Sequence, residues 1–279
     1  MPDLPPGRRL ALPGRGTTFI RELPGPPGAP VVFLLHGWTA TADLNFFMCY
    51  SALAEHFRVV AIDHRGHGRG IRTARPFKLS DCADDAVAVA DQLGIDTFIP
   101  VGYSMGGTVA QLVWKRHRPR VRGLVLCATS GYFAEHTIEK RRFALLTTIM
   151  HASRVTPKPV RDLISDRLFV SRKTMVWEKW AVDEVARHEW RHILEAGAAL
   201  GRYDSRGWLG TVDVPTSVVI NDSDRVVATK RQRELAAAIP GARSWEVHGD
   251  HDSVWANAGS FVPALLQACA NAAGTPINA

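Results

Sequence analysis

The chain lacks the long apolar runs and targeting features of membrane and exported proteins. None of its 279 residues belongs to an apolar run of the roughly 18–20 residues that a membrane-spanning helix requires. Residues 1–16 are rich in Pro, Gly and Arg and contain no apolar core of a secretory signal. They predict a short flexible arm that leads into a first strand. We also find no internal repeat, and we expect a cytoplasmic protein.

Cysteine is scarce, and no two cysteines are close in the sequence. The chain has four, at Cys49, Cys82, Cys127 and Cys269, and no C-x-x-C pair. This spacing argues against both a zinc site and a disulfide framework. We predict buried, reduced thiols and expect no metal and no cofactor.

Positive charge is in excess but is dispersed. The chain has 34 Lys and Arg against 27 Asp and Glu, which gives a formal net charge of +7. The basic residues occur in pairs and triplets, such as Lys140-Arg141-Arg142 and Lys230-Arg231, and never in a run of five. No recognised nucleic-acid motif accompanies them. We interpret these charges as solvated surface, and expect neither a nucleic-acid partner nor stable membrane insertion. Nothing in the sequence indicates an oligomeric state.

Apolar, β-rich runs alternate with amphipathic segments, a pattern typical of a parallel sheet covered by helices. We therefore predict the α/β class. The predicted strands cover residues 31–35, 58–62, 97–101, 123–127, 216–220 and 243–247. The predicted helices cover residues 46–56, 81–93 (capped by Ser80 or Asp81), 105–116, 229–238 and 253–270. Residues 131–208 carry no convincing strand signal and predict a helical insertion, or cap, in a core made of residues 17–130 and 209–273.

The most informative motif is Gly102-Tyr103-Ser104-Met105-Gly106, which has the G-x-S-x-G spacing. A serine at the tip of a strained strand-to-helix turn presents its Oγ to a substrate, and the flanking glycines relieve crowding in that turn. Here the motif follows a predicted strand and precedes a predicted helix, as that turn requires. Ser104 is therefore the candidate nucleophile.

A serine nucleophile needs a base, an acid that orients the base, and donors for the oxyanion. Asp224 follows the predicted strand 216–220 and is the favoured acid, with Asp222 as its rival. His251 follows the last predicted strand and is the favoured base. Its rival, His248, stands at the strand end and is expected to point into packing.

The oxyanion donors are expected to be two backbone N–H groups. One belongs to Met105, directly after the nucleophile. The other belongs to Trp38, in the loop that follows the strand 31–35. Each such donor typically stabilises a transition state by about 2.7–4 kcal/mol.

Together these motifs resemble the α/β-hydrolase superfamily over residues 17–270. They are His36-Gly37-Trp38, Asp63-His64-Arg65-Gly66-His67-Gly68, the serine motif, and the late Asp224 and His251. The resemblance implies an eight-stranded, mostly parallel sheet with a helical cap after the sixth strand, where residues 131–208 fit. It points to the branch of small bacterial esterases, perhydrolases, enol-lactonases, C–C bond hydrolases and epoxide hydrolases. We interpret residues 63–68 as a structural turn beside the serine, not as catalytic.

A serine at this position favours acyl transfer to water. Epoxide hydrolases and haloalkane dehalogenases resemble this pattern but carry aspartate there. We expect a carboxylic ester hydrolase that acts through a Ser-His-Asp triad and an acyl-enzyme on a small-molecule ester. A C–C bond hydrolase, an enol-lactonase or a perhydrolase would use the same triad. A ligand receptor or scaffold on the same fold is the alternative that is not an enzyme.

The substrate pocket is expected to be apolar and to involve the cap. Besides Trp38 and Met105, the candidate lining residues are Phe46, Phe47, Phe133, Trp177 and Trp180. Each of these aromatic residues has an ordinary alternative role in the core. An apolar pocket would suit an uncharged acyl or aryl ester of small to medium size.

Overall fold

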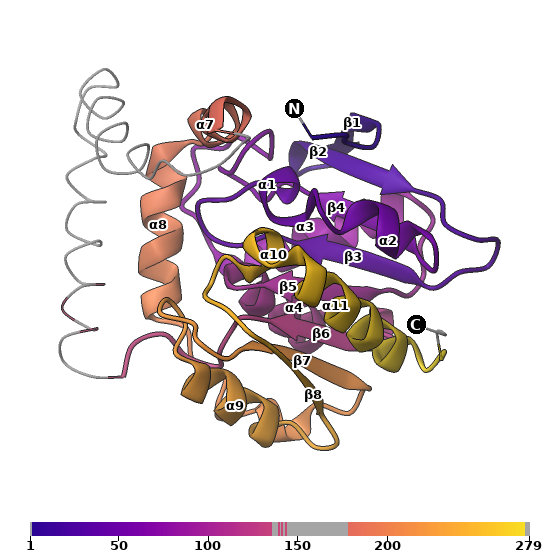
Figure 1. The fold of residues 1–279 in the computed structure, drawn as a ribbon. Helices are drawn as coiled ribbons and strands as arrows, with labels where there is room; N and C mark the ends of the chain where they lie inside the picture. The colour runs from indigo at the N-terminus through magenta and orange to yellow at the C-terminus, as the bar shows by residue number, and fades with distance from the viewer. Residues whose placement is uncertain (1, 136–138, 140, 142, 144–177, 277–279) are drawn as a thin grey trace.

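An eight-stranded sheet forms the centre of the molecule (Figure 1). The structure is a computed structural model that describes residues 2–135, 139, 141, 143 and 178–276. The sheet order is β1-β2-β4-β3-β5-β6-β7-β8. Strands β1 and β2 are antiparallel to each other, β2 is antiparallel to β4, and the remaining neighbours are parallel. The strands are Gly7–Leu12 (β1), Gly16–Leu23 (β2), Val31–Leu35 (β3), Arg58–Ile62 (β4), Ile99–Tyr103 (β5), Leu124–Cys127 (β6), Thr216–Asn221 (β7) and Arg243–Val247 (β8).

Helices cover both faces of this sheet, so its central strands are buried and apolar along their whole length. Each face has its own apolar core, one under α11 and one under α3 and α4. One face carries Ala42–Phe46 (α1), Tyr50–Ala54 (α2), Ser253–Ala256 (α10) and Ala258–Ala273 (α11). The other carries Leu79–Gln92 (α3), Met105–His117 (α4) and Thr229–Ala238 (α9), and short 3-10 turns lie at Arg118–Arg120 (η1) and Leu209–Thr211 (η2). The predicted α/β class and the mostly parallel sheet are confirmed.

The N-terminal segment differs from the flexible arm that the sequence predicts. Residues Gly7–Leu12 form strand β1, which pairs with β2 along its whole length. The two strands meet in a tight turn, in which the Arg15 N–H donates to the Leu12 carbonyl at 3.0 Å and Gly14 has φ 72°. The pair Pro13-Gly14 is typical of a turn. The prediction rested on the Pro, Gly and Arg content of the whole segment and overlooked this pair.

Two helix starts also differ from their predictions. The helix expected over 46–56 is two short helices, and the first begins after Thr41, whose hydroxyl accepts from the Leu44 N–H at 3.1 Å. Helix α3 begins at Leu79 after an extended Lys78, which makes no side-chain cap, so Ser80 and Asp81 lie in its first turn. No helix among the described residues is long and apolar enough to span a bilayer.

The structure describes two α-helices between β6 and β7, where the sequence predicts a cap. They are Glu178–Ala186 (α7) and Trp190–Gly201 (α8), and most of the rest of the predicted cap, Trp177 included, lies outside the described residues. The α7–α8 turn binds the loop after β4. There the Glu189 N–H donates to the Gly66 carbonyl at 2.8 Å, and the Gly68 N–H donates to His188 Nδ1 at 2.9 Å. This turn therefore fixes α8 over the carboxyl ends of the parallel strands.

Candidate active site

Ser104 lies at a sharp turn between β5 and α4. Its backbone has φ 53° and ψ −116°, a conformation that non-glycine residues rarely adopt. The turn is held because the Ser104 N–H donates to the Cys127 carbonyl at 2.9 Å and the Thr129 hydroxyl donates to the Ser104 carbonyl at 2.7 Å. A Cβ at Gly106 would overlap the Leu35 carbonyl of β3, so the helix packs this close to the sheet only with glycine there.

The structure brings Ser104, His251 and Asp224 into one hydrogen-bonded chain. His251 Nε2 lies 2.9 Å from Ser104 Oγ, and His251 Nδ1 lies 2.8 Å from Asp224 Oδ2. An ionised carboxylate only accepts, so Nδ1 carries the proton and Nε2 accepts from the serine hydroxyl. This is the tautomer that a general base needs.

The Asp224 side chain is fully buried and accepts four hydrogen bonds, which fix its orientation. Its Oδ1 accepts from the N–H groups of Val226 and Val227, each at 2.8 Å. Its Oδ2 accepts from Gln232 Nε2 at 2.9 Å as well as from His251. Gln232 is fully buried on α9 and was not predicted from the sequence, because nothing in its neighbourhood marks it.

The rival acid and base form a separate pair at the surface. His248 Nδ1 lies 3.0 Å from Asp222 Oδ2, and the His248 side chain is 85% exposed instead of pointing into packing as expected. The His248 and Gly249 bonds of Asp222 lower its pKa to about 2. Of these two Asp–His pairs, only that of Asp224 and His251 reaches Ser104.

The loop that carries His251 is anchored to the sheet by Tyr103 and Asn221. The Tyr103 hydroxyl donates to the His251 carbonyl at 2.8 Å. Asn221 Nδ2 donates both to the Tyr103 hydroxyl at 3.2 Å and to the Asp250 carbonyl at 2.9 Å. Burial raises the pKa of Tyr103 well above its usual value, so its hydroxyl stays protonated and can keep donating.

Trp38 and Met105 follow two adjacent strands at the same edge of the sheet. Leu35 of β3 pairs with Gly102 of β5, so the loops after these strands lie side by side. Within the described residues neither the Trp38 N–H nor the Met105 N–H has a hydrogen-bond acceptor. The loop after β3 is also anchored by Asn45, whose Oδ1 accepts a hydrogen bond from the Gly37 N–H at 2.6 Å.

Neutral histidines support the same loop. His36 Nε2 accepts from the His64 N–H at 2.9 Å, so the His36 proton is on Nδ1, which donates to the Gly37 carbonyl at 2.8 Å. Burial lowers the pKa of His36, and lowers those of His64 and His67 further. In the turn between α7 and α8, burial lowers the pKa of His188 to about 3. All four rings are therefore uncharged at neutral pH.

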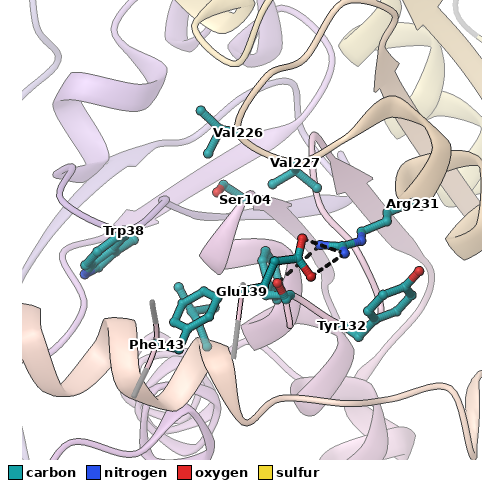
Figure 2. Close-up of a pocket in the computed structure, with 10 residues that line it drawn as sticks. Trp38, Ser104, Tyr132, Glu139, Phe143, Val226, Val227 and Arg231 are labelled. Atoms are coloured by element: carbon teal, nitrogen blue, oxygen red, sulfur yellow. Dashed lines mark hydrogen bonds and ion pairs between the residues drawn. The ribbon is translucent and has the colours of Figure 1, made fainter. Parts of the chain in front are cut away.

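A cavity of about 270 Å³ opens beside Ser104 (Figure 2). Phe133 and Trp38, both predicted, line it, and Trp38 Nε1 donates to the Ile193 carbonyl of α8 at 2.7 Å. The other lining residues are Ser104, Tyr132, Glu139, Phe143, Leu200, Val226, Val227 and Arg231.

Three other predicted lining residues lie elsewhere. Phe46 is fully buried in the core on the α11 face. The Phe47 and Trp180 rings meet edge to face, with centroids 5.5 Å apart. None of the three is among the residues that line the cavity, and neither is the fully buried Met105, which was also predicted to line it.

Arg231 is a lining residue that the charge pattern had suggested to be solvated surface. Its side chain is only 15% exposed and forms an ion pair with Glu139, which also lines the cavity. The four cysteines of the chain are free and buried, and within the described residues no three His, Cys, Asp or Glu side chains are placed to hold a metal ion. The groups that meet at the site are a serine hydroxyl, an imidazole and a carboxyl group.

Comparison with known proteins identifies the family. A family model for the α/β-hydrolase fold matches residues 30–258. The bifunctional esterase/perhydrolase DCH of Acinetobacter calcoaceticus is 29% identical over 225 residues, which cover 73% of this chain and 77% of that protein. The protein therefore belongs to the α/β-hydrolase family, as the resemblance of its motifs implied.

Solved structures agree with this assignment. A hydrolase from Pseudomonas aeruginosa PA01 superposes with a TM-score of 0.78 at 22% identity, covering 95% of this chain and 98% of its own. The enol-lactonase of Burkholderia xenovorans LB400 gives a TM-score of 0.72 at 25% identity, covering 93% and 98%. The chain is thus similar over nearly its whole length to hydrolases of this fold.

Proposed function

We propose that this hydrolase cleaves carboxylic esters whose acyl group is small and uncharged, through a Ser104–His251–Asp224 triad. The observation that carries the proposal is the continuous hydrogen-bonded chain from Ser104 Oγ through His251 to Asp224. The rare backbone conformation of Ser104 and its position beside the cavity support it. So does the relative whose name records esterase activity.

The reaction begins when Ser104 Oγ attacks the ester carbonyl and His251 Nε2 takes its proton. Asp224 holds the imidazole by its Nδ1–H and stabilises the imidazolium. The free N–H groups of Trp38 and Met105 bind the oxyanion. His251 then protonates the leaving alcohol. Water, deprotonated by the same imidazole, attacks the acyl-enzyme. The imidazolium then returns the proton to Ser104 Oγ as the acid is released.

The test is hydrolysis of p-nitrophenyl acetate and butyrate by the wild type and by Ser104→Ala. We expect kcat/KM to fall by about 10⁴-fold or more in this variant, since the nucleophile is lost. Ser223→Ala is the matched control, because Ser223 is exposed and its hydroxyl donates to Asp222 at 2.8 Å. Equal activity in Ser104→Ala would show that another group does the chemistry.

Cleavage of enol-lactones or formation of peracids from hydrogen peroxide would use the same triad, and each activity is recorded in the name of a similar protein. Assays with a lactone, and with an ester plus peroxide, would rank these against simple esters. Activity on either must also disappear in Ser104→Ala.

A further inference from the structure

A charged pair lies inside a cavity whose other walls are largely apolar. Arg231 Nη2 lies 2.8 and 2.7 Å from the two carboxylate oxygens of Glu139, and Arg231 Nη1 donates to the Phe133 carbonyl at 3.2 Å. The side chains are 15% and 28% exposed. Figure 2 shows the pair among the lining residues, between Ser104 and Tyr132 in this view.

The pair keeps this part of the cavity polar without giving it a net charge. Burial opposes the charge of Arg231, but the hydrogen bonds and charge of Glu139 outweigh burial and raise the pKa of Arg231. The guanidinium also lies over the Tyr132 ring, 4.8 Å from its centroid. Arg231 therefore stays cationic, and Glu139 balances its charge.

A guanidinium has five N–H donors, and the hydrogen bonds of Arg231 to Glu139, Phe133 and Tyr132 still leave it capacity to donate to a ligand. A saturated acyl chain placed against the pair would remove water from both charges and return no hydrogen bond. A carboxylate would compete with Glu139 for the same donors. An uncharged oxygen could accept from Arg231 while the ion pair stays intact.

We propose that the Arg231–Glu139 pair selects esters whose acyl group is uncharged and carries a keto or hydroxyl oxygen. This inference rests on the proposed esterase function and adds the class of substrate. The cavity volume of about 270 Å³ suits a short acyl group. Arg231 and Glu139 are thus specificity residues of the site, separate from the Ser104 chemistry.

The test compares three nearly isosteric methyl esters: methyl pentanoate, methyl 4-oxopentanoate and monomethyl succinate. A second set one carbon longer contains methyl hexanoate, methyl 5-oxohexanoate and monomethyl glutarate. Acid release is followed by pH-stat, and each kcat/KM is divided by the rate of alkaline hydrolysis of the same ester. In at least one set we expect the keto ester to exceed the alkyl ester by about tenfold, the effect of one charge-assisted hydrogen bond. The carboxylate ester should not exceed the alkyl ester.

Three variants separate the roles of the two charges. Arg231→Met should abolish the keto preference. Glu139→Gln leaves Arg231 uncompensated, so the carboxylate ester should gain at least about tenfold over the alkyl ester. Arg206→Met is the matched control, because Arg206 stacks on the Tyr132 ring at 4.2 Å but does not line the cavity. Its selectivity should equal that of the wild type. Because each selectivity is a ratio of two kcat/KM values measured on the same preparation, differences in the fraction of folded enzyme cancel.

Two results would overturn the inference while leaving the proposed function in place. One is that all esters of each set react within twofold of one another in the wild type and in both pocket variants. The other is a wild-type preference for the carboxylate esters. If the wild type hydrolyses neither these six esters nor p-nitrophenyl acetate, the proposed function fails, and this inference with it.

Discussion

At the scale of single residues, the site depends on which aspartate faces His251. Asp224 and Asp222 lie two positions apart, and each bonds a histidine. Asp224 has a fully buried side chain and Asp222 a partly exposed one. The backbone turn after β7, where Val226 and Val227 donate to Asp224, decides between them, and no spacing in the sequence shows that turn.

Asp224→Asn and Asp222→Asn are therefore a matched pair of variants. Asp224→Asn removes the acceptor that holds the His251 tautomer, so we expect kcat for p-nitrophenyl acetate to fall by about 10⁴-fold. Asp222→Asn alters only bonds at the surface, to His248, Gly249 and Ser223, and should change kcat less than twofold. Equal losses in the two variants would contradict the assignment of Asp224.

Gln232 gives a second prediction at this scale. It donates to Asp224 Oδ2 and accepts from the Asn221 N–H at 3.0 Å, so it positions the acid without touching the substrate. Gln232→Met should lower kcat by about tenfold, the loss of one hydrogen bond to a charged group, with KM nearly unchanged. An effect on KM alone would instead place Gln232 near the substrate.

At the scale of elements, the close packing of α4 on the sheet positions Ser104 beside the cavity. The predicted strands 31–35 and 58–62 match β3 and β4, because apolar runs of this length between turns are typical of buried strands, and the predicted strand 243–247 matches β8. Strand β1 was missed because exposed Arg8 and Arg9 interrupt its apolar pattern. Arg231 was misread because its partner Glu139 is distant in sequence, and only the folded chain brings them together.

Gly106→Ala tests the contact between α4 and β3. A methyl group there would meet the Leu35 backbone, which cannot rotate away, so we expect a loss of about 3 kcal/mol or more in the free energy of unfolding. Gly259→Ala, on the exposed first turn of α11 with open space around it, should instead stabilise by about 0.4–1 kcal/mol. Urea denaturation measures both, and a mild effect of Gly106→Ala would contradict the close approach.

At the scale of the whole molecule, α7 and α8 bind the core through groups that must stay neutral. His188 accepts from the Gly68 N–H, and Trp38 donates to α8. His36, His64 and His67 lie beneath, with the His36 and His64 ring centroids 4.4 Å apart and those of His67 and His188 5.5 Å apart. Protonation of these rings would place like charges together in the interior.

The stability of the protein should therefore fall in mild acid. Because the four folded-state pKa values lie below the ordinary histidine value, the unfolded chain takes up protons first as the pH falls below about 6.5. Each such histidine lowers the free energy of unfolding by about 2 kcal/mol when the pH falls from 7.5 to 5.0. Urea denaturation at these two pH values checks this, and His188→Gln should show a smaller difference. The same difference in both proteins would contradict a neutral, buried His188.

The central claim, that Ser104 is a nucleophile activated by His251, is tested most directly by covalent labelling. The intact protein is treated with a fluorophosphonate, and its mass and peptides are measured. We predict one adduct per chain, on the peptide that contains Ser104, with labelling lost in Ser104→Ala and strongly slowed in His251→Gln. An unlabelled but folded wild type, or an adduct that persists in Ser104→Ala, would contradict the claim.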